Sequence, residues 1–157
     1  MQLHPGDKAP LFNMFDSDRQ PVSLESFRGH NVVLHFYPAA FTSTCTKQLC
    51  TVRDDLSFYN DLDAKVIGIS TDSLYVLKKY KEEQNLNFTL ASDYNKEVCG
   101  MYGAQYELFN YGMKGTAKRA AFVIDKKGII QYAEVLDNAS GLPDFDLIKE
   151  TLKKLDA

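Results

Sequence analysis

Cys45 stands just after the point where a strand pattern gives way to a helix pattern. Residues 32–37 form an apolar, aromatic and β-branched run, which is typical of a buried strand. Pro38 ends this strand because proline has no N–H to donate to a neighbouring strand. The hydroxyl side chains at positions 42–44 can cap a helix, which the apolar periodicity extends to about Asn60. Cys45 is therefore expected in the first turn of that helix.

A cysteine in a first helical turn has surroundings that favour the thiolate. The first turn leaves backbone N–H groups unpaired and carries the positive end of the helix dipole, and both stabilise a negative sulfur. The thiolate is the reactive form of cysteine, so this position predicts a nucleophile. The alternative from position alone is a small buried hydrophobic residue, because free cysteines are among the most buried residue types.

A specific motif surrounds this cysteine. The spacing Pro-x-x-x-Thr-x-x-Cys is formed by Pro38, Thr42 and Cys45, and in this context the sequence resembles the peroxiredoxins, thiol peroxidases built on a thioredoxin-like fold. Arg119, at the start of an apolar run that ends in aspartate, resembles the second active-site arginine of that family. The segment 6–10 is similar to the family's N-terminal signature. The resemblance therefore makes a reactive Cys45 the favoured interpretation.

The resemblance also implies a role for each matched residue. Cys45 would attack the peroxide and become a sulfenic acid, Thr42 would hydrogen-bond the thiolate and the peroxide, and Arg119 would stabilise the developing charge. Pro38 would shield the pocket. Gln48 is a departure, since many relatives carry glutamate at this position, and the amide removes one carboxylate from the predicted site.

A sulfenic acid must be resolved by a thiol before it oxidises further. Cys50 lies five residues after Cys45, as in the bacterioferritin-comigratory, or Q-type, peroxiredoxins. The segment 39–42, in contrast, resembles the AhpE-like branch, in which another molecule often supplies the second thiol. The sequence therefore makes Cys50 the candidate resolving cysteine and leaves Cys99 and an external thiol as alternatives.

The helical period separates the two neighbouring cysteines. Cys45 begins the apolar face of its helix, whereas Cys50 shares a side with polar residues and points about 140° away. An accessible thiol is therefore expected at Cys50. Cys99 has apolar neighbours and is expected to be buried, and His35, inside the central strand, is expected to be a packed core residue.

The order of elements predicts an α/β protein. Strands that alternate with helices imply parallel pairing with right-handed crossovers, and the resemblance implies a thioredoxin-like fold with a central mixed sheet flanked by helices. We expect a single domain over residues 1–157, with an N-terminal β-hairpin added to the sheet. The expected strands are 12–14 and 22–24 (the hairpin), 31–37, 65–70, 88–91 (a short edge strand), 120–124 and 129–135, and the expected helices are 42–60, 73–84, 95–101 and one from residue 144 onward.

Composition limits the setting of this chain. With 157 residues, 45% hydrophobic, 25% charged and a net charge of -3, it is an ordinary globular sequence without a basic patch, so no nucleic-acid partner is expected. The longest apolar run, 32–41, is about half the length of a membrane span. Residues 1–7 lack the basic and apolar regions of a secretory signal. Three cysteines do not suggest a disulfide framework, so we expect a cytoplasmic protein with a redox thiol.

The resemblance to the peroxiredoxins implies a thiol-dependent peroxidase that reduces hydrogen peroxide and organic hydroperoxides. It would need no cofactor, would be recycled by thioredoxin or a similar thiol reductant, and would be a monomer or homodimer. An alternative of a different class is a thioredoxin-fold binding or chaperone protein with incidental thiols. A zinc site formed by Cys45, Cys50, Cys99 and a histidine is a further alternative, although CxxxxC without a second close ligand pair is poor zinc spacing.

Overall fold

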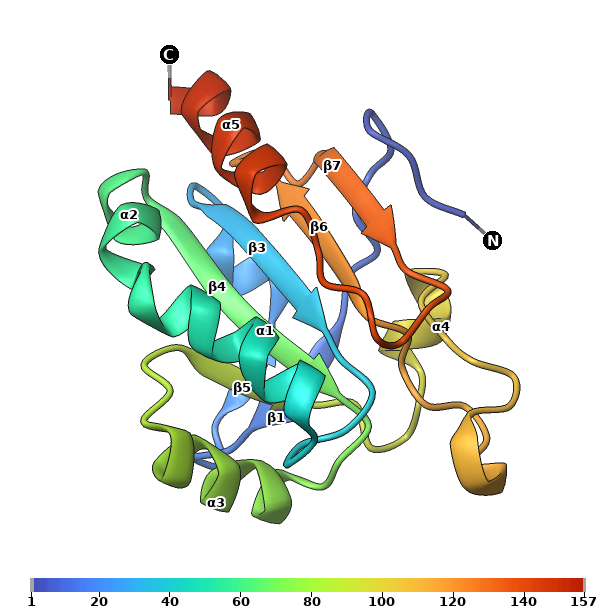
Figure 1. Cartoon of the computed structure of the whole chain (residues 1–157). Coiled ribbons are helices and arrows are strands. Elements are labelled where there is room, and N and C mark those ends of the chain that lie inside the picture. Colours follow the sequence, from blue (N-terminus) through green and yellow to red (C-terminus); the bar gives the residue numbers. More distant parts are fainter. Residues whose placement is uncertain (1, 157) are drawn as a thin grey trace.

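The computed structural model describes residues 2–156 and contains one mixed sheet of seven strands in the order β2-β1-β5-β4-β3-β6-β7 (Figure 1). The strands are β1 (Asn13–Asp16), β2 (Pro21–Ser23), β3 (Asn31–Phe36), β4 (Ala64–Ser70), β5 (Thr89–Ser92), β6 (Ala120–Ile124) and β7 (Ile130–Val135). β3 runs parallel to β4 and antiparallel to β6, and β4 runs parallel to β5. This is the predicted mixed sheet of a thioredoxin-like α/β fold.

Helices lie on both faces of the sheet (Figure 1). They are α1 (Ser43–Asp54), α2 (Leu56–Asp61), α3 (Leu74–Gln84), α4 (Val98–Met101) and α5 (Phe145–Asp156), with two short 3-10 turns, η1 (Leu24–Phe27) and η2 (Asn110–Gly112). Alternate residues of β3 point to opposite faces. On one face Val33 packs with Leu49 of α1 and Ile148 of α5. On the other face Leu34 packs with Val98 of α4.

Two expectations about the sheet and its helices were wrong in detail. β5 is not an edge strand, because β1 pairs with it through Phe15 and Ser92 and so extends the sheet by the N-terminal hairpin. The long helix over 42–60 breaks at Asp55, whose backbone N–H bonds to the carbonyl of Val52 three residues back. The break coincides with a contact to the last helix, since the Asp55 carboxylate accepts a hydrogen bond from Lys149 Nζ at 2.6 Å.

The short helix around Cys99 begins three residues later than expected. Lys96 has a left-handed backbone, with a φ of 63°, so it cannot belong to a right-handed helix. The buried Asp93 carboxylate accepts hydrogen bonds from the N–H groups of Glu97, Val98 and Cys99 and thereby caps α4.

Among residues 2–156, no helix has the combined length and hydrophobicity that a membrane span requires.

Candidate active site

A pocket of about 220 Å³ opens at the N-terminal end of α1. Three separate parts of the chain meet there: the turn after β3 with Pro38, the first turn of α1 with Thr42 and Cys45, and the residue before β6, Arg119. The structure thus brings together all four residues that the peroxiredoxin resemblance singles out. Phe109 and other side chains of the loop between α4 and β6 form the remaining wall.

Cys45 lies in the first turn of α1, as the sequence predicts, and its side chain is only 1% exposed. The first backbone bond of the helix runs from the Thr46 N–H to the Thr42 carbonyl at 2.9 Å. The N–H groups of residues 43–45 precede that bond, so they can stabilise negative charge at the entrance to the helix.

The expected hydroxyl cap does not form. Thr42 occupies the N-cap position, but its side chain makes no capping bond. Its Oγ1 instead donates to the carbonyl of Ala39 at 2.7 Å, because the turn after Pro38 brings that carbonyl within reach. Because the Thr42 hydroxyl already donates its only proton to Ala39, its oxygen can act only as a hydrogen-bond acceptor toward the pocket.

Arg119 is the largest fully buried side chain of the molecule within the described residues, at 2% exposure. Its NH1 lies 3.3 Å from Cys45 Sγ and 2.8 Å from Gln48 Oε1, and its NH2 donates to the carbonyl of Ala139 at 2.8 Å. These partners fix the plane of the guanidinium. A fixed cation beside the sulfur stabilises a thiolate and can hold a peroxide oxygen.

The turn that carries the pocket is anchored from β4. The Ala40 N–H donates to Asp72 Oδ2 at 2.8 Å, and the Ser70 hydroxyl donates to the same oxygen at 2.7 Å. Phe41 has a φ of 66°, a conformation that costs free energy for a residue with a Cβ, and its ring packs against Tyr80 at 4.9 Å between centroids. The surrounding contacts therefore hold a turn that the local sequence alone would not favour.

Gln48 joins the site to the sheet. It is fully buried in α1, where its Oε1 accepts from Arg119 and its Nε2 lies 2.9 Å from His35 Nδ1 and 3.4 Å from the Phe36 carbonyl. His35 is also fully buried, as expected for a core residue. Burial lowers the pKa of its imidazole to about 4, so the ring is neutral at physiological pH.

The other two cysteines lie away from the pocket. Cys50 is half-buried, with its Sγ 3.8 Å from Gln84 Oε1 at the end of α3, so it is less accessible than its polar helix face suggested. Cys99 is buried as expected, and burial, reinforced by the charge of Asp93, raises the pKa of its thiol to about 12. In the described chain, no three His, Cys, Asp or Glu side chains gather as metal ligands, so the zinc alternative has no supporting cluster there.

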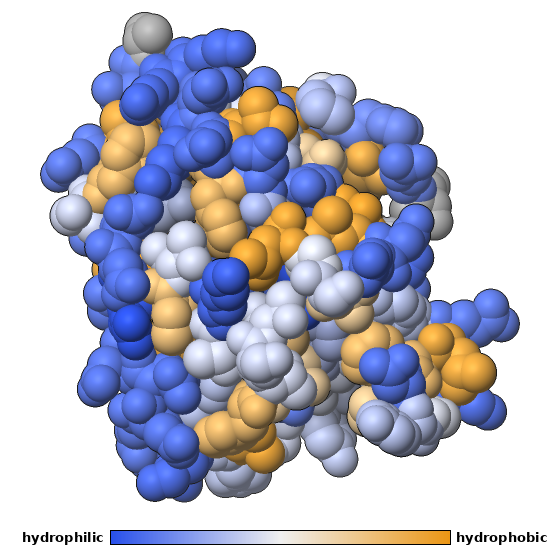
Figure 2. All heavy atoms as spheres, in the orientation of Figure 1, coloured by the Kyte–Doolittle hydropathy of each residue, from blue (hydrophilic) through white to orange (hydrophobic). Residues whose placement is uncertain are grey.

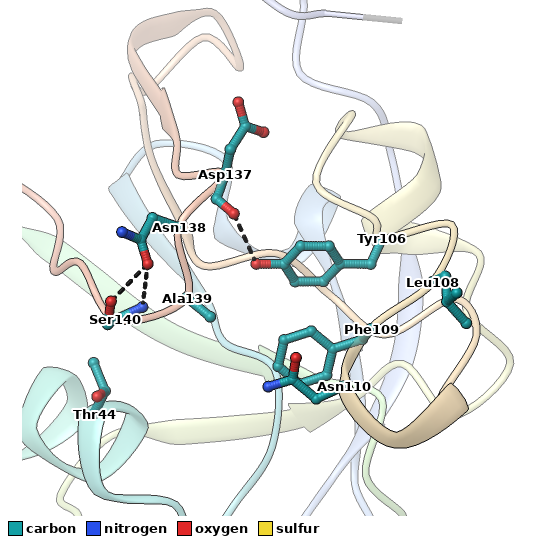
Figure 3. Close-up of a pocket in the computed structure, with 9 residues that line it drawn as sticks. All are labelled: Thr44, Tyr106, Leu108, Phe109, Asn110, Asp137, Asn138, Ala139 and Ser140. Carbon is teal, nitrogen blue, oxygen red and sulfur yellow. Dashed lines mark hydrogen bonds between the residues drawn. The ribbon is translucent and has the colours of Figure 1, made fainter.

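A second hollow of about 760 Å³ adjoins the cysteine pocket, because both are lined by Thr44, Phe109 and Ala139. Figure 3 shows the residues that line this second hollow. Tyr106 and Phe109 stack on one side with ring centroids 4.7 Å apart, and Ala139 lies on the loop that faces them. The loop that carries η2 projects from the molecule and shows hydrophobic surface (Figure 2), with Leu108 64% and Met113 43% exposed. The entrance to the pocket is therefore partly apolar.

Two features of the site escape sequence reasoning. The carbonyl of Ala139 holds Arg119 from a loop without any motif, and a backbone group at such a position leaves no signal in the sequence. The contact between His35 and Gln48 has a weak signal, since two polar residues occur at positions where a strand and a helix each face the core. Helical and strand periodicity places each of them inward, but only the packing of α1 on β3 pairs them.

Comparison with known proteins agrees with the site. Residues 5–133 match the AhpC/TSA family. A protein of Mycobacterium tuberculosis strain H37Rv that is named as a peroxiredoxin is 42% identical over 142 residues, covering 89% of this chain and 90% of its own length. Peroxiredoxin Bcp of Escherichia coli K12 is 36% identical over 153 residues, covering 97% of each chain.

A solved structure of a similar protein has the same fold as this chain. The crystal structure of peroxidoxin BcpB from Mycobacterium tuberculosis superposes with a TM-score of 0.86 at 29% identity, covering 98% of this chain and 99% of that one. The family match extends over most of the chain, and the relatives exceed one third identity over nearly their whole length. The chain therefore belongs to the AhpC/TSA family, the peroxiredoxins, and is a thiol-dependent peroxidase.

Proposed function

We propose that Cys45 is the residue that attacks the peroxide. Its thiolate takes the terminal hydroxyl group of a hydroperoxide as the O–O bond breaks, which gives a sulfenic acid on the protein. The other oxygen leaves with the bonding electrons and takes up a proton, so the product is water or an alcohol. The observation that carries this proposal is the 3.3 Å contact between Cys45 Sγ and the buried guanidinium of Arg119.

The surrounding residues divide the remaining work. Arg119 stabilises the thiolate and then the charge that develops on the leaving oxygen. The Thr42 hydroxyl donates a hydrogen bond to the Ala39 carbonyl, so its oxygen accepts a hydrogen bond from the O–H of the hydroperoxide and aligns the O–O bond with the sulfur. Pro38 is buried at the pocket and excludes water from its floor.

Cys50 is proposed to resolve the sulfenic acid. Its thiol attacks the oxidised sulfur, a disulfide forms, and water leaves. Thioredoxin or a similar dithiol reductant then reduces the disulfide by thiol exchange. In support of this role, Cys50 lies five residues from Cys45 on the same helix, is half-buried rather than sealed in the core, and is more accessible than Cys99.

The proposed substrates are hydrogen peroxide and organic hydroperoxides. The pocket has room for more than the peroxide group, and its apolar wall around Phe109 and Met113 suits an alkyl substituent. We place the enzyme in the cytoplasm, as a single domain that acts as a monomer or homodimer. The single continuous sheet supports one domain, and three free thiols suit a reducing compartment.

Mass spectrometry after one equivalent of hydrogen peroxide tests these assignments. The unaltered protein should lose two hydrogens and give a Cys45–Cys50 linked peptide, whereas Cys50→Ser should retain a trappable sulfenic acid on Cys45. Cys45→Ser should lose peroxidase activity, because a serine hydroxyl is not ionised at neutral pH, and Cys99→Ser is the matched control that should keep it. Full activity in Cys45→Ser would refute the assignment of the nucleophile.

A further inference from the structure

The orientation of the Gln48 amide follows from its three neighbours. Arg119 NH1, at 2.8 Å, can only donate, so the amide atom facing it must be the oxygen. The Phe36 carbonyl, at 3.4 Å from the other amide atom, can only accept, so that atom must be the NH2 group. Two independent partners therefore require the same orientation, in which Nε2 faces His35.

This orientation determines the state of His35. The Gln48 NH2 group donates to His35 Nδ1 at 2.9 Å, so Nδ1 must carry a lone pair and the ring proton must sit on Nε2. Nε2 itself is buried without a partner among the described residues, so nothing there competes for the choice of tautomer.

The surroundings of His35 keep the ring neutral. Phe145 of α5 lies against it at 5.9 Å between ring centroids, and its register neighbours on β4 and β6 are Gly68 and Ala121. The guanidinium of Arg119 lies on the far side of the Gln48 amide and does not contact the ring. Burial lowers the pKa of the imidazole to about 4, and the bond that Nδ1 accepts from Gln48 also favours the neutral ring.

We infer that His35 is a positioning residue for the peroxidase reaction, because its unprotonated Nδ1 holds the Gln48 amide with the oxygen turned toward Arg119. The inference rests on the proposed roles of Cys45 and Arg119. Through Gln48, the imidazole holds the Arg119 guanidinium in the orientation in which NH1 contacts Cys45 Sγ. His35 does not touch the reacting atoms.

Removal of the imidazole acceptor would release this arrangement. In His35→Phe the ring volume is roughly kept, but one N–H of Gln48 loses its partner. The present orientation then depends on the contact with Arg119 and on the long contact to the Phe36 carbonyl, without the imidazole acceptor. If the amide turns over, its NH2 group meets the NH1 donor of Arg119, and the guanidinium must move away from Gln48. The contact from Arg119 to Cys45 then weakens.

A double-mutant cycle tests the inference, with the rate constant for Cys45 oxidation by hydrogen peroxide as the readout. His35→Phe should slow oxidation roughly tenfold. In the Gln48→Glu background the same change should alter the rate by less than about twofold, because a carboxylate presents an acceptor to Arg119 in either orientation. Val33→Ala, a buried change on the same face of β3, is the matched control and should leave the rate unchanged.

The possible results are distinguishable. An unchanged rate in His35→Phe, or an equal loss with and without the Gln48→Glu substitution, would overturn the inference and leave His35 a packing residue. Should His35→Phe not fold, nitrogen NMR of the unaltered protein decides, since a protonated Nδ1 near neutral pH would contradict the inference and a protonated Nε2 would support it. Failure of the proposed function itself would appear separately, as peroxide turnover that persists in Cys45→Ser.

Discussion

A disulfide between Cys45 and Cys50 requires the N-terminal half of α1 to unwind. Both residues lie within the continuous helix Ser43–Asp54. A rise of about 1.5 Å per residue, a Cα radius of about 2.3 Å and a rotation of about 140° place their Cα atoms roughly 8 to 9 Å apart. Disulfides rarely tolerate a Cα separation above about 7 Å. The folded helix therefore cannot hold this bond, and oxidation should convert a helical site into a locally unfolded one.

Part of the cost of unwinding comes from Gln48, which lies between the two cysteines. Its bond from Arg119 involves a charged donor and is worth about 1.5 to 3 kcal/mol, and its bond to His35 is worth about 1 kcal/mol. Leaving the reduced helix therefore costs about 3 kcal/mol from these contacts, which corresponds to a factor of roughly one hundred in the population of the open turn.

Hydrogen exchange followed by mass spectrometry measures this difference. In the disulfide form, the amides of Thr46, Lys47 and Gln48 should exchange about one hundred times faster than in the reduced protein. Peroxide-treated Cys50→Ser is the control, because its sulfenic acid needs no unwinding and exchange in α1 should stay slow. Equal exchange in a protein shown to contain the Cys45–Cys50 bond would refute the geometric reasoning.

Three further predictions concern single groups. Arg119→Ala should slow oxidation of Cys45 by peroxide, because the buried guanidinium contacts its sulfur. Arg119→Lys should recover only part of the rate, because an ammonium cannot reach Sγ, Gln48 and Ala139 together. Because the pKa of Cys99 is raised to about 12, a disulfide reagent at pH 8 should label it far more slowly than Cys50 in the native protein and equally fast in urea. The pKa of His35 is lowered from 6.5 to about 4, so between these pH values the unfolded chain binds a proton at His35 that the folded protein does not. The free energy of unfolding, measured by urea titration, should therefore fall by roughly 3 kcal/mol as the pH drops from 6.5 to 4. In His35→Phe this part of the pH dependence should be absent.

The local part of the site was predictable because it depends on a short stretch of chain. The change from strand to helix at Pro38 places Cys45 in a first turn by geometry alone, and the structure has it there. The apolar period of α1 correctly predicted that Cys45 faces inward. Arg119, 74 residues from Cys45, could not be placed beside it by any local rule, and only the family resemblance suggested the pairing.

The parts that sequence reasoning missed depend on contacts between distant segments. β5 lacks any local sign that β1 will pair with it, so its short apolar pattern suggested an edge strand. The helix break at Asp55 coincides with an ion pair to Lys149, which lies on the last helix. Periodicity describes which face of an element is buried, but it does not say which element covers that face.

The position of Gln48 links the two proposed halves of the catalytic cycle. In the reduced protein Gln48 braces Arg119 against Cys45, and it is held in turn by His35. The unwinding that brings Cys45 to Cys50 must displace Gln48, because it lies on the turn between them. Arg119 then keeps the Ala139 carbonyl as a partner but loses both the amide and the sulfur. A site in the disulfide form is therefore unable to bind and activate a second peroxide, and reduction of the disulfide must rebuild the helix, the amide orientation and the arginine plane together before the next turnover.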